Sequence, residues 1–130
     1  MTSKNKRVLI LDDNEDMLEL VKEIMLNEGY EVEGFTSTDD IIQLVKQHQP
    51  DLVITDYILS GINGGEYCHQ IKVHPETSHI PVIMLSAFTR VLESLGNYGW
   101  DAFIAKPFSL DEITNTVKDL LNLSEENCCA

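Results

Sequence analysis

Residues 8–13 read Val-Leu-Ile-Leu-Asp-Asp, four apolar side chains followed directly by two acids. Two later stretches have the same form: Leu-Val-Ile-Thr-Asp at residues 52–56 and Ala-Phe-Ile-Ala-Lys-Pro at residues 102–107. Short apolar runs of this kind predict strands that are buried in a parallel sheet. Because the carboxyl ends of such strands line the ligand crevice of an open α/β sheet, we expect the acids and the lysine to face one crevice.

Helical patterns separate the apolar runs. After Asp13, apolar residues recur at spacings of three and four, which predicts a buried helix face made of Met17, Leu20, Val21, Ile24 and Met25. Residues 14–16 supply an N-cap and first-turn acids, and Gly29 supplies a stop. A short strand at residues 32–35 is followed by a second capped helix, which ends before Pro50 and carries Ile41, Ile42, Leu44 and Val45.

The second half of the chain continues this alternation. A Gly-rich loop at residues 60–65 leads into a helix that carries Cys68, Ile71 and Lys72. A fourth strand at residues 81–85 delivers Ser86, a weaker helix covers residues 89–95, and a capping box at residues 109–112 opens the last helix. Five such units predict an α/β fold with one doubly wound, five-stranded parallel sheet.

Size and charge limit the classes of partner. The chain has 130 residues, and we assign residues 1–123 to a single domain and residues 124–130 to a flexible tail. Its 9 Lys and Arg against 22 Asp and Glu give a net charge of −13. Such a surface repels nucleic acids and anionic lipids, so we expect neither as a direct partner.

No apolar run reaches the length of a signal peptide core or a membrane span. The cysteines are Cys68 and the adjacent pair Cys128-Cys129, an odd number without a spaced framework, which indicates reduced thiols and a cytoplasmic location. We interpret Cys128-Cys129 as part of the tail rather than as metal ligands.

The residues at the predicted strand ends suit phosphoryl chemistry. Asp12, Asp13 and Asp56 would repel one another unless a divalent cation lay between them, and all-oxygen ligation favours Mg²⁺ or Mn²⁺. Asp12-Asp13 alone could equally be a helix cap. A carboxylate beside such a cation can accept a phosphoryl group, which assigns that role to Asp56. Lys106 would supply positive charge opposite the metal and Ser86 a hydroxyl donor.

With their order and spacing, Asp12-Asp13, Asp56, Ser86 and Lys106-Pro107 resemble the receiver domain of two-component response regulators. The resemblance covers about residues 7–122. It implies a flavodoxin-like (βα)5 fold with strand order 2-1-3-4-5. It also implies that the chain is a signalling phosphoacceptor in a phosphorelay rather than an enzyme, and that Asp56 is the phosphorylated residue.

Further roles are implied by the same resemblance. Mg²⁺ would be held by Asp13, Asp56 and the backbone carbonyl of Ile58, with Asp12 acting mainly through a metal-bound water. Lys106 would pair with the phosphoryl group, and its bond to Pro107 would be cis. Ser86 would swing towards the phosphoryl group while Phe103, at the aromatic switch position, moves inward.

Partners are likewise implied. The phosphoryl donor would be a histidine kinase or a histidine phosphotransfer protein. The output surface, formed by the fourth helix, fifth strand and fifth helix, would contact a downstream protein or an output domain. The chain would be either a stand-alone receiver or part of a longer protein.

The sequence departs from the family pattern at several positions. Ser60 replaces a frequent proline, and Phe103 lacks the hydroxyl of the commoner tyrosine. Ile58 and Phe88 lie two residues beyond Asp56 and Ser86, where neither can orient an attacking water, so we predict slow loss of the phosphoryl group. Trp100 is interpreted as core packing, with a partner anchor as the alternative. The four histidines are interpreted as solvent-side residues: His48, His69, His74 and His79.

An enzyme on a related fold is the competing hypothesis. It would be either a phosphatase with an aspartyl intermediate or a nucleotide binder. A phosphatase of the haloacid dehalogenase type would need a second acid where Ile58 stands. A nucleotide binder would need a phosphate cradle where the acidic residues 12–16 stand. A receiver that docks partners without phosphorylation is a third possibility.

Overall fold

The computed structural model describes residues 6–56, 58–59, 62–86 and 100–129. Its main sheet has five parallel strands: β1 (Arg7–Leu11), β2 (Glu31–Phe35), β3 (Leu52–Asp56), β6 (Val82–Ser86) and β7 (Ala102–Ala105). The strands lie in the order β2-β1-β3-β6-β7, which is the expected 2-1-3-4-5 order. The predicted doubly wound parallel sheet is therefore confirmed.

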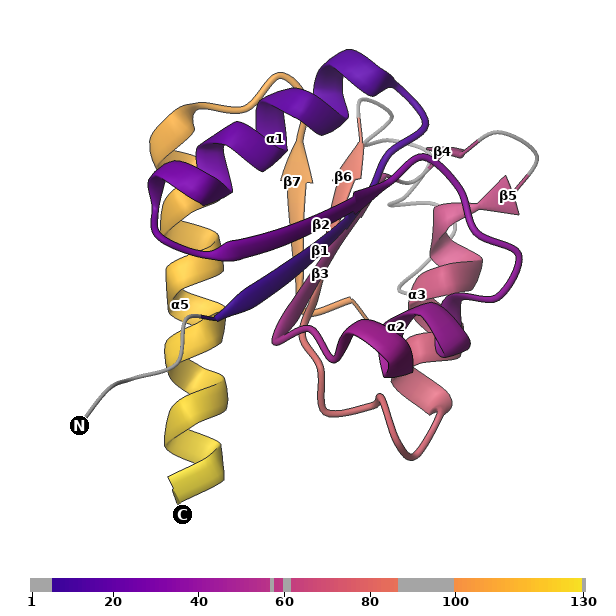
Figure 1. The fold of residues 1–130 in the computed structure, drawn as a ribbon. Helices are drawn as coiled ribbons and strands as arrows, with labels where there is room; N and C mark the ends of the chain where they lie inside the picture. Colours follow the sequence, from indigo (N-terminus) through magenta and orange to yellow (C-terminus); the bar gives the residue numbers. More distant parts are fainter. Residues whose placement is uncertain (1–5, 57, 60–61, 87–99, 130) are drawn as a thin grey trace.

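Helices cover both faces of this sheet. Helices α1 (Glu15–Asn27) and α5 (Leu110–Cys129) pack on one face, and α2 (Ile41–His48) and α3 (Gly64–Val73) pack on the other (Figure 1). The weaker helix predicted at residues 89–95 lies outside the described residues.

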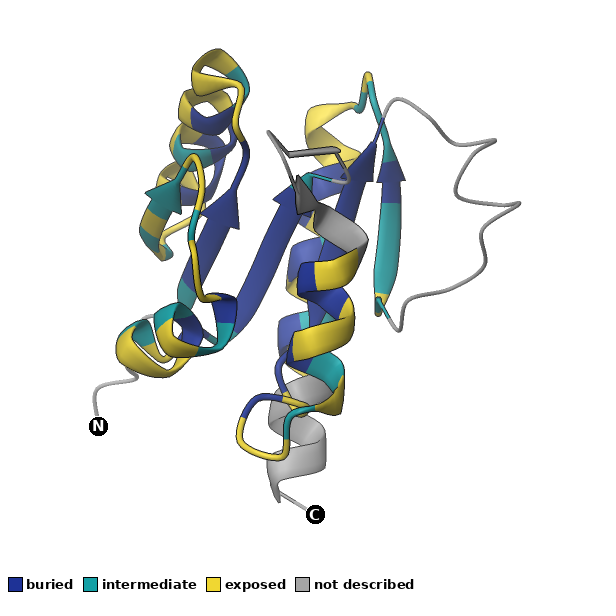
Figure 2. Ribbon diagram, turned by 90° about the vertical axis from the view of Figure 1, so that its right-hand side faces the viewer, coloured by how far each residue is buried: buried dark blue, intermediate teal, exposed yellow. Residues whose placement is uncertain are grey.

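Alternation along the strands creates two buried clusters. On β1, Val8 and Ile10 belong to the buried cluster between the sheet and helices α1 and α5, called here the α1/α5 cluster. Leu9 and Leu11 belong to the buried cluster between the sheet and helices α2 and α3, called here the α2/α3 cluster. The central strands β1, β3 and β6 are buried, the edge strands β2 and β7 are less so, and the outer faces of the helices are exposed, as Figure 2 shows. Because both faces are covered, the central strands need continuous apolar runs rather than alternating ones.

The predicted helix boundaries correspond to real caps. The side chains of Asn14, Asp40 and Ser109 each accept a hydrogen bond of 3.1 Å from the backbone N–H three residues further on. Gly29 adopts a positive φ of 91° just beyond α1, and Gln49 adopts a φ of 50° at the end of α2, immediately before Pro50. These residues fix where the helices begin and end, and so where the following strands start.

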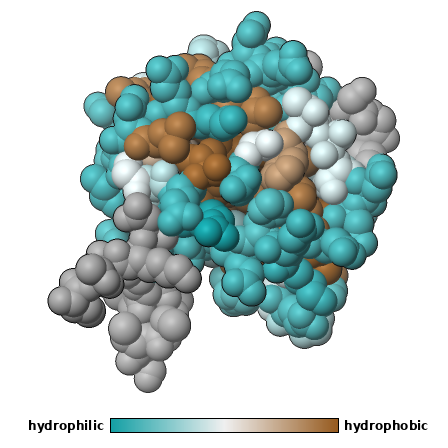
Figure 3. Space-filling view, in the orientation of Figure 1, coloured by the Kyte–Doolittle hydropathy of each residue, from teal (hydrophilic) through white to brown (hydrophobic). Residues whose placement is uncertain are grey.

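The predicted buried face of α1 is wrong in one residue. Leu20 is 46% exposed, and Leu18 takes its place in the core beside Val21, Ile24 and Met25. Apolar surface over α1 and β2 is visible among hydrophilic atoms in Figure 3. The spacing of three and four is satisfied by Leu18 as well as by Leu20, so the position of the sheet decides between them.

One further segment differs from the prediction, and a predicted helix runs on beyond its expected residues. Strands β4 (Ile58–Leu59) and β5 (Ile62–Asn63) form a short antiparallel pair at the loop expected over residues 60–65, and α3 begins within that loop at Gly64. Helix α5 runs to Cys129, into the segment from residue 124, and the flexibility of that segment stays a prediction. No proline or glycine interrupts residues 124–129, so the sequence contains no strong stop for this helix.

The two ends of the described chain lie away from the carboxyl ends of the strands. The carboxyl ends of β6 and β7 point towards the upper end of the molecule in Figure 1, whereas β1 begins and α5 ends towards the lower end. None of the described helices combines the length and apolar character that a membrane span requires.

Candidate functional site

Four strand ends bring the predicted site residues to one edge of the sheet. Asp12 directly follows β1, Asp56 ends β3, Ser86 ends β6, and Lys106 directly follows β7. These four strands are consecutive neighbours in the sheet, so the residues form a row across its carboxyl edge. Asp13, the next residue after Asp12, joins the same group.

Three carboxylates converge at this edge. One oxygen from each of Asp12, Asp13 and Asp56 can be chosen so that all lie within 4.8 Å of one another. Asp12 is buried, Asp56 is half-buried and Asp13 is exposed. A donor set made only of carboxylate oxygens, open to solvent on one side, fits Mg²⁺ or Mn²⁺, and the residues present therefore suit the expected metal.

Lys106 partly balances the carboxylates. Its Nζ lies 3.1 Å from Oδ1 of Asp56 and 3.5 Å from Oδ2 of Asp12. Its backbone N–H donates to the carbonyl of Ser86 at 2.9 Å, which fixes the start of the side chain beside β6. The Lys106–Pro107 peptide bond is cis, as the resemblance implied.

Asp12 has protein partners at both of its carboxylate oxygens. Oδ1 accepts the backbone N–H of Asn14 at 3.0 Å, and Oδ2 faces Lys106. The side chain is only 1% exposed, so this charge depends on these two partners in place of water. Asp13 and Asp56 are the carboxylates whose oxygens are more accessible to an incoming ligand.

Ser86 and Phe103 lie on the neighbouring strands β6 and β7. Ser86 is buried at the end of β6, and Phe103 on β7 pairs in register with Met84 on β6. Phe103 is half-buried, and its ring centroid lies 6.1 Å from that of Trp100. Both aromatic rings pack against the α2/α3 cluster, so the interpretation of Trp100 as core packing is supported.

Some predicted site features are not tested by these residues. Ile58 begins β4, opposite Asn63, but the metal role of its carbonyl stays a prediction. Ser60 and Phe88 lie outside the described residues.

The histidines lie away from the carboxylates, on α2, on α3 and after α3. His69 and His79 are exposed as predicted. The other two are only partly exposed: His48 is half-buried against Phe35, with ring centroids 5.2 Å apart, and the Nδ1 atom of half-buried His74 accepts the N–H of Glu76.

The sequence reasoning missed two polar features, one beside the site and one at the opposite end of the sheet. The buried Thr55 hydroxyl donates to the carbonyl of Asp56 at 3.1 Å. Lys72 on α3 donates to Asp101 at 2.9 Å, and the same oxygen of Asp101 accepts the N–H of Val82 at 2.8 Å, which ties α3 to the starts of β6 and β7. A threonine at the end of the run 52–55 was the one available signal for the first feature.

The thiol of Cys68 takes no part in this chemistry. It is fully buried on α3 in the α2/α3 cluster, and desolvation raises its pKa to about 12. Lys72 lowers the pKa and Asp101 raises it, both by smaller amounts than desolvation. It is therefore neutral and unreactive at physiological pH.

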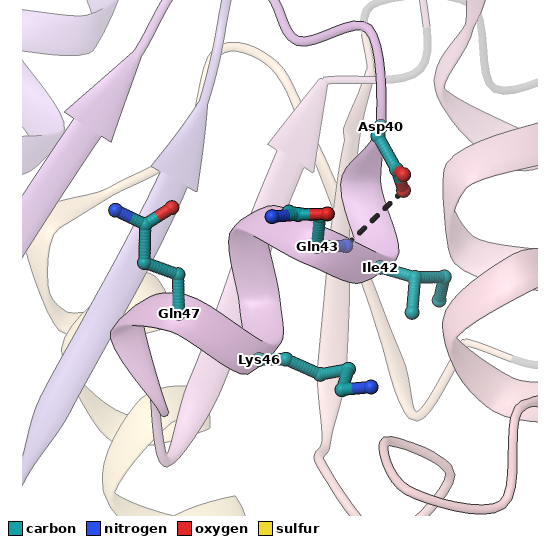
Figure 4. A pocket seen from close by; sticks show the side chains of 5 residues that line it. All are labelled: Asp40, Ile42, Gln43, Lys46 and Gln47. Atoms are coloured by element: carbon teal, nitrogen blue, oxygen red, sulfur yellow. Dashed lines mark hydrogen bonds between the residues drawn. The ribbon is translucent and has the colours of Figure 1, made fainter.

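A hollow on α2 is separate from the carboxylate site. It is lined by Asp40, Ile42, Gln43, Lys46 and Gln47, all from one helix and its cap (Figure 4). The side chain of Asp40 accepts the N–H of Gln43 and so caps the helix. The lining has no convergent group of charges, so the carboxylate edge remains the stronger candidate site.

Comparison with known families identifies the pattern. The model of the response regulator receiver domain matches residues 8–118. The chain is 33% identical over 118 residues to the polar-differentiation response regulator DivK of Brucella ovis, covering 89% of this chain and 96% of DivK. It is 32% identical over 117 residues to the phosphate regulon transcriptional regulatory protein PhoB of Rhizobium meliloti, covering 88% of this chain. It spans only 52% of PhoB.

Solved structures agree with this result. A CheY-like response regulator receiver domain protein from Methanospirillum hungatei superposes with a TM-score of 0.82 at 28% identity, covering 95% of this chain and 99% of the other. The receiver domain of a signal transduction histidine kinase from Syntrophus aciditrophicus superposes with a TM-score of 0.81 at 30% identity, covering 90% of each chain.

Proposed function

Because this chain belongs to the response regulator receiver domain family, we propose that Asp56 accepts a phosphoryl group in a Mg²⁺-dependent reaction. The observation that carries the proposal is the convergence of three carboxylates within 4.8 Å, with Lys106 in contact with two of them. This arrangement supplies a nucleophile, a cation site and a fixed positive charge at one sheet edge. The proposed donor is a histidine kinase or a histidine phosphotransfer protein.

In the proposed transfer, an oxygen of Asp56 attacks the phosphorus atom of a phosphohistidine. The new P–O bond forms as the P–N bond breaks, and the electron pair of the broken bond remains on the donor imidazole. Asp13, Asp56 and the carbonyl of Ile58 would hold Mg²⁺, with Asp12 acting through water. When bound there, Mg²⁺ would neutralise charge on the phosphoryl oxygens and orient them for attack.

Lys106 has the second role in this proposal. Its Nζ contacts the Oδ1 atom of Asp56 at 3.1 Å, so it is already beside the oxygens that would carry the phosphoryl group. After transfer it would pair with a phosphoryl oxygen, while the hydroxyl of Ser86 would donate to another. Phe103, half-buried beside Ser86's strand, would follow the movement of Ser86.

The proposed output is a change in protein binding at the face that includes β7 and α5. A downstream protein or an output domain would recognise that face, and the expected compartment is the cytoplasm. The strongly acidic chain makes a protein a more suitable direct partner than nucleic acid or an anionic membrane.

Chemical phosphorylation tests the assignment of Asp56. The purified protein is incubated with acetyl phosphate, with Mg²⁺ or with EDTA, and its intact mass is measured. We expect one added phosphoryl group with Mg²⁺ and none with EDTA. Asp56→Asn should abolish the addition, while Asp119→Asn, which alters an exposed acid on α5, should not.

Two results would contradict the proposal. Phosphorylation that persists in Asp56→Asn would place the acceptor elsewhere. Repeated release of phosphate from a small phosphoester, without a phosphorylated protein, would favour the competing phosphatase hypothesis.

The lifetime of the phosphorylated form tests the prediction of slow hydrolysis. Apolar residues at positions 58 and 88 should leave an attacking water without a hydrogen-bonding partner. We expect Ile58→Asn to lose its phosphoryl group faster than the wild type, as followed by intact mass after removal of acetyl phosphate. Equal lifetimes, or a wild-type lifetime of seconds, would contradict the prediction.

A further inference from the structure

Thr55 places a hydroxyl in an apolar environment next to the proposed phosphoacceptor. It is 1% exposed and pairs in register with Leu11 on β1 and Met84 on β6. It shares a strand face with Val53, and Leu11, Val53 and Met84 all belong to the α2/α3 cluster. Its hydroxyl donates to the backbone carbonyl of Asp56 at 3.1 Å.

Packing alone does not explain this hydroxyl. Valine has nearly the same shape as threonine, is favoured in strands, and would add apolar contact at a buried position. A hydroxyl in such a position is costly unless it is hydrogen-bonded, and here the bond goes to the residue that carries the reactive carboxylate. The bond therefore indicates a role for the Asp56 carbonyl rather than for the core.

The orientation of that carbonyl sets the direction of the chain beyond β3. A peptide group is planar, so fixing its oxygen fixes the rotation about the Cα–C bond of Asp56. Ile58 begins β4 two residues later and is held opposite Asn63. The hydroxyl of Thr55 thus constrains Asp56, and the β4–β5 pairing constrains Ile58, whose carbonyl is the implied metal ligand.

We propose that Thr55 is a positioning residue for the metal site: its hydroxyl aims the chain leaving β3 so that the Ile58 carbonyl can bind Mg²⁺. This inference rests on the proposed function, because it concerns the same cation. It assigns Thr55 no contact with the metal or with the phosphoryl group. Loss of the hydroxyl therefore weakens metal binding and leaves the carboxylate nucleophile intact.

Replacing Thr55 by valine separates these two effects. A single hydrogen bond of this kind corresponds to a roughly 2- to 10-fold change in an equilibrium constant. We expect Thr55→Val to raise the Kd for Mg²⁺ by about that factor, measured by calorimetric titration of the unphosphorylated protein. The rate of phosphorylation by acetyl phosphate at saturating Mg²⁺ should stay near that of the wild type. Thr55→Ser keeps the hydroxyl and should restore most of the Mg²⁺ affinity.

Thr77 provides a matched control. It is also 1% exposed, and its hydroxyl donates to a backbone carbonyl, that of Ile71, at 2.7 Å. Thr77 follows α3, away from the carboxylate site. Thr77→Val should lower the free energy of unfolding without changing the Kd for Mg²⁺.

The outcomes distinguish this inference from the proposed function. Wild-type affinity for Mg²⁺ in Thr55→Val would overturn the inference, as would an equal loss of affinity in Thr77→Val. A loss that Thr55→Ser fails to restore would also overturn it. If the wild-type protein itself neither binds Mg²⁺ nor becomes phosphorylated, the proposed function fails and the inference fails with it.

Discussion

Asp13 carries the exposed charge of the carboxylate site, and replacing it by asparagine should stabilise the metal-free protein. Among the described residues, Lys106 contacts the carboxylates of Asp12 and Asp56, and no ion pair involves Asp13. Three carboxylates at −1 each and one ammonium at +1 leave a local charge of −2. Removing the charge of Asp13 halves this imbalance.

The distance between the carboxylates sets the magnitude. At the upper limit of 4.8 Å between carboxylate oxygens, two unit charges repel by about 0.9 kcal/mol in water and about 3.5 kcal/mol at an effective dielectric constant of 20. Because Asp13 is exposed and Lys106 offsets part of the repulsion, a net effect near the lower value is expected. Asp13→Asn should therefore gain about 1 kcal/mol, or roughly 3 to 5 °C in Tm for a domain of this size.

Unfolding with and without Mg²⁺ provides the assay. A ligand at 100 times its Kd stabilises a native protein by about 2.7 kcal/mol, and Asp13→Asn should lose much of this gain. The variant is then more stable than the wild type in EDTA and less stable in saturating Mg²⁺. Asp119→Asn should shift neither curve appreciably. A variant that is less stable in EDTA, or that gains as much from Mg²⁺ as the wild type, would refute the reasoning.

Three other features lead to measurable effects. Trp100 is the single tryptophan, so phosphorylation should change the intrinsic fluorescence of the wild type but not of Asp56→Asn; an unchanged spectrum would argue against coupling to the aromatic pair. The pKa of Cys68 is raised from 9.0 to about 12, so the unfolded thiol ionises first and stability should fall as pH rises above 9, more steeply than in Cys68→Ala. Parallel urea-unfolding profiles would contradict this. A Cβ on Gly34 would lie 2.9 Å from the Cδ atom of Lys22, so Gly34→Ala should cost about 1 kcal/mol, with partial recovery in a Lys22→Ala background. Equal unfolding midpoints for Gly34→Ala and the wild type would show that the contact is easily relieved.

The sequence predicted the sheet and the site because both depend on short, strong local signals. The runs at residues 8–11 and 52–55 are too apolar for any position except the interior of a covered sheet. Once the strands are parallel neighbours, the residues at their carboxyl ends must meet. The strand pattern alone was therefore enough to predict that Asp12, Asp56 and Lys106 lie close together.

The errors arise where local signals are degenerate. Leu18 and Leu20 both continue a helical apolar pattern, and only the sheet beneath α1 selects Leu18. The β4–β5 pair has two residues in each strand, too few for a periodic signal. Residues 124–129 contain no helix stop, so the sequence alone does not define where α5 ends.

Hydrogen-bond partners distant in sequence were also beyond prediction. The sequence shows that Lys72 and Asp101 carry opposite charges, but not that they meet beside Val82. Such pairs depend on how helices and strands pack against one another, which local sequence patterns do not predict.

The location of the two chain ends has a practical consequence. Since β1 starts and α5 finishes at the side of the domain remote from the carboxylates, an affinity handle, a fluorescent protein or a surface linker joined at either end would leave the acidic edge facing the solution. Immobilised protein could then be exposed to successive phosphodonors and chelators while remaining accessible to soluble partners. A reporter fused at each end would accordingly be suited to following binding at the far edge without obstructing it.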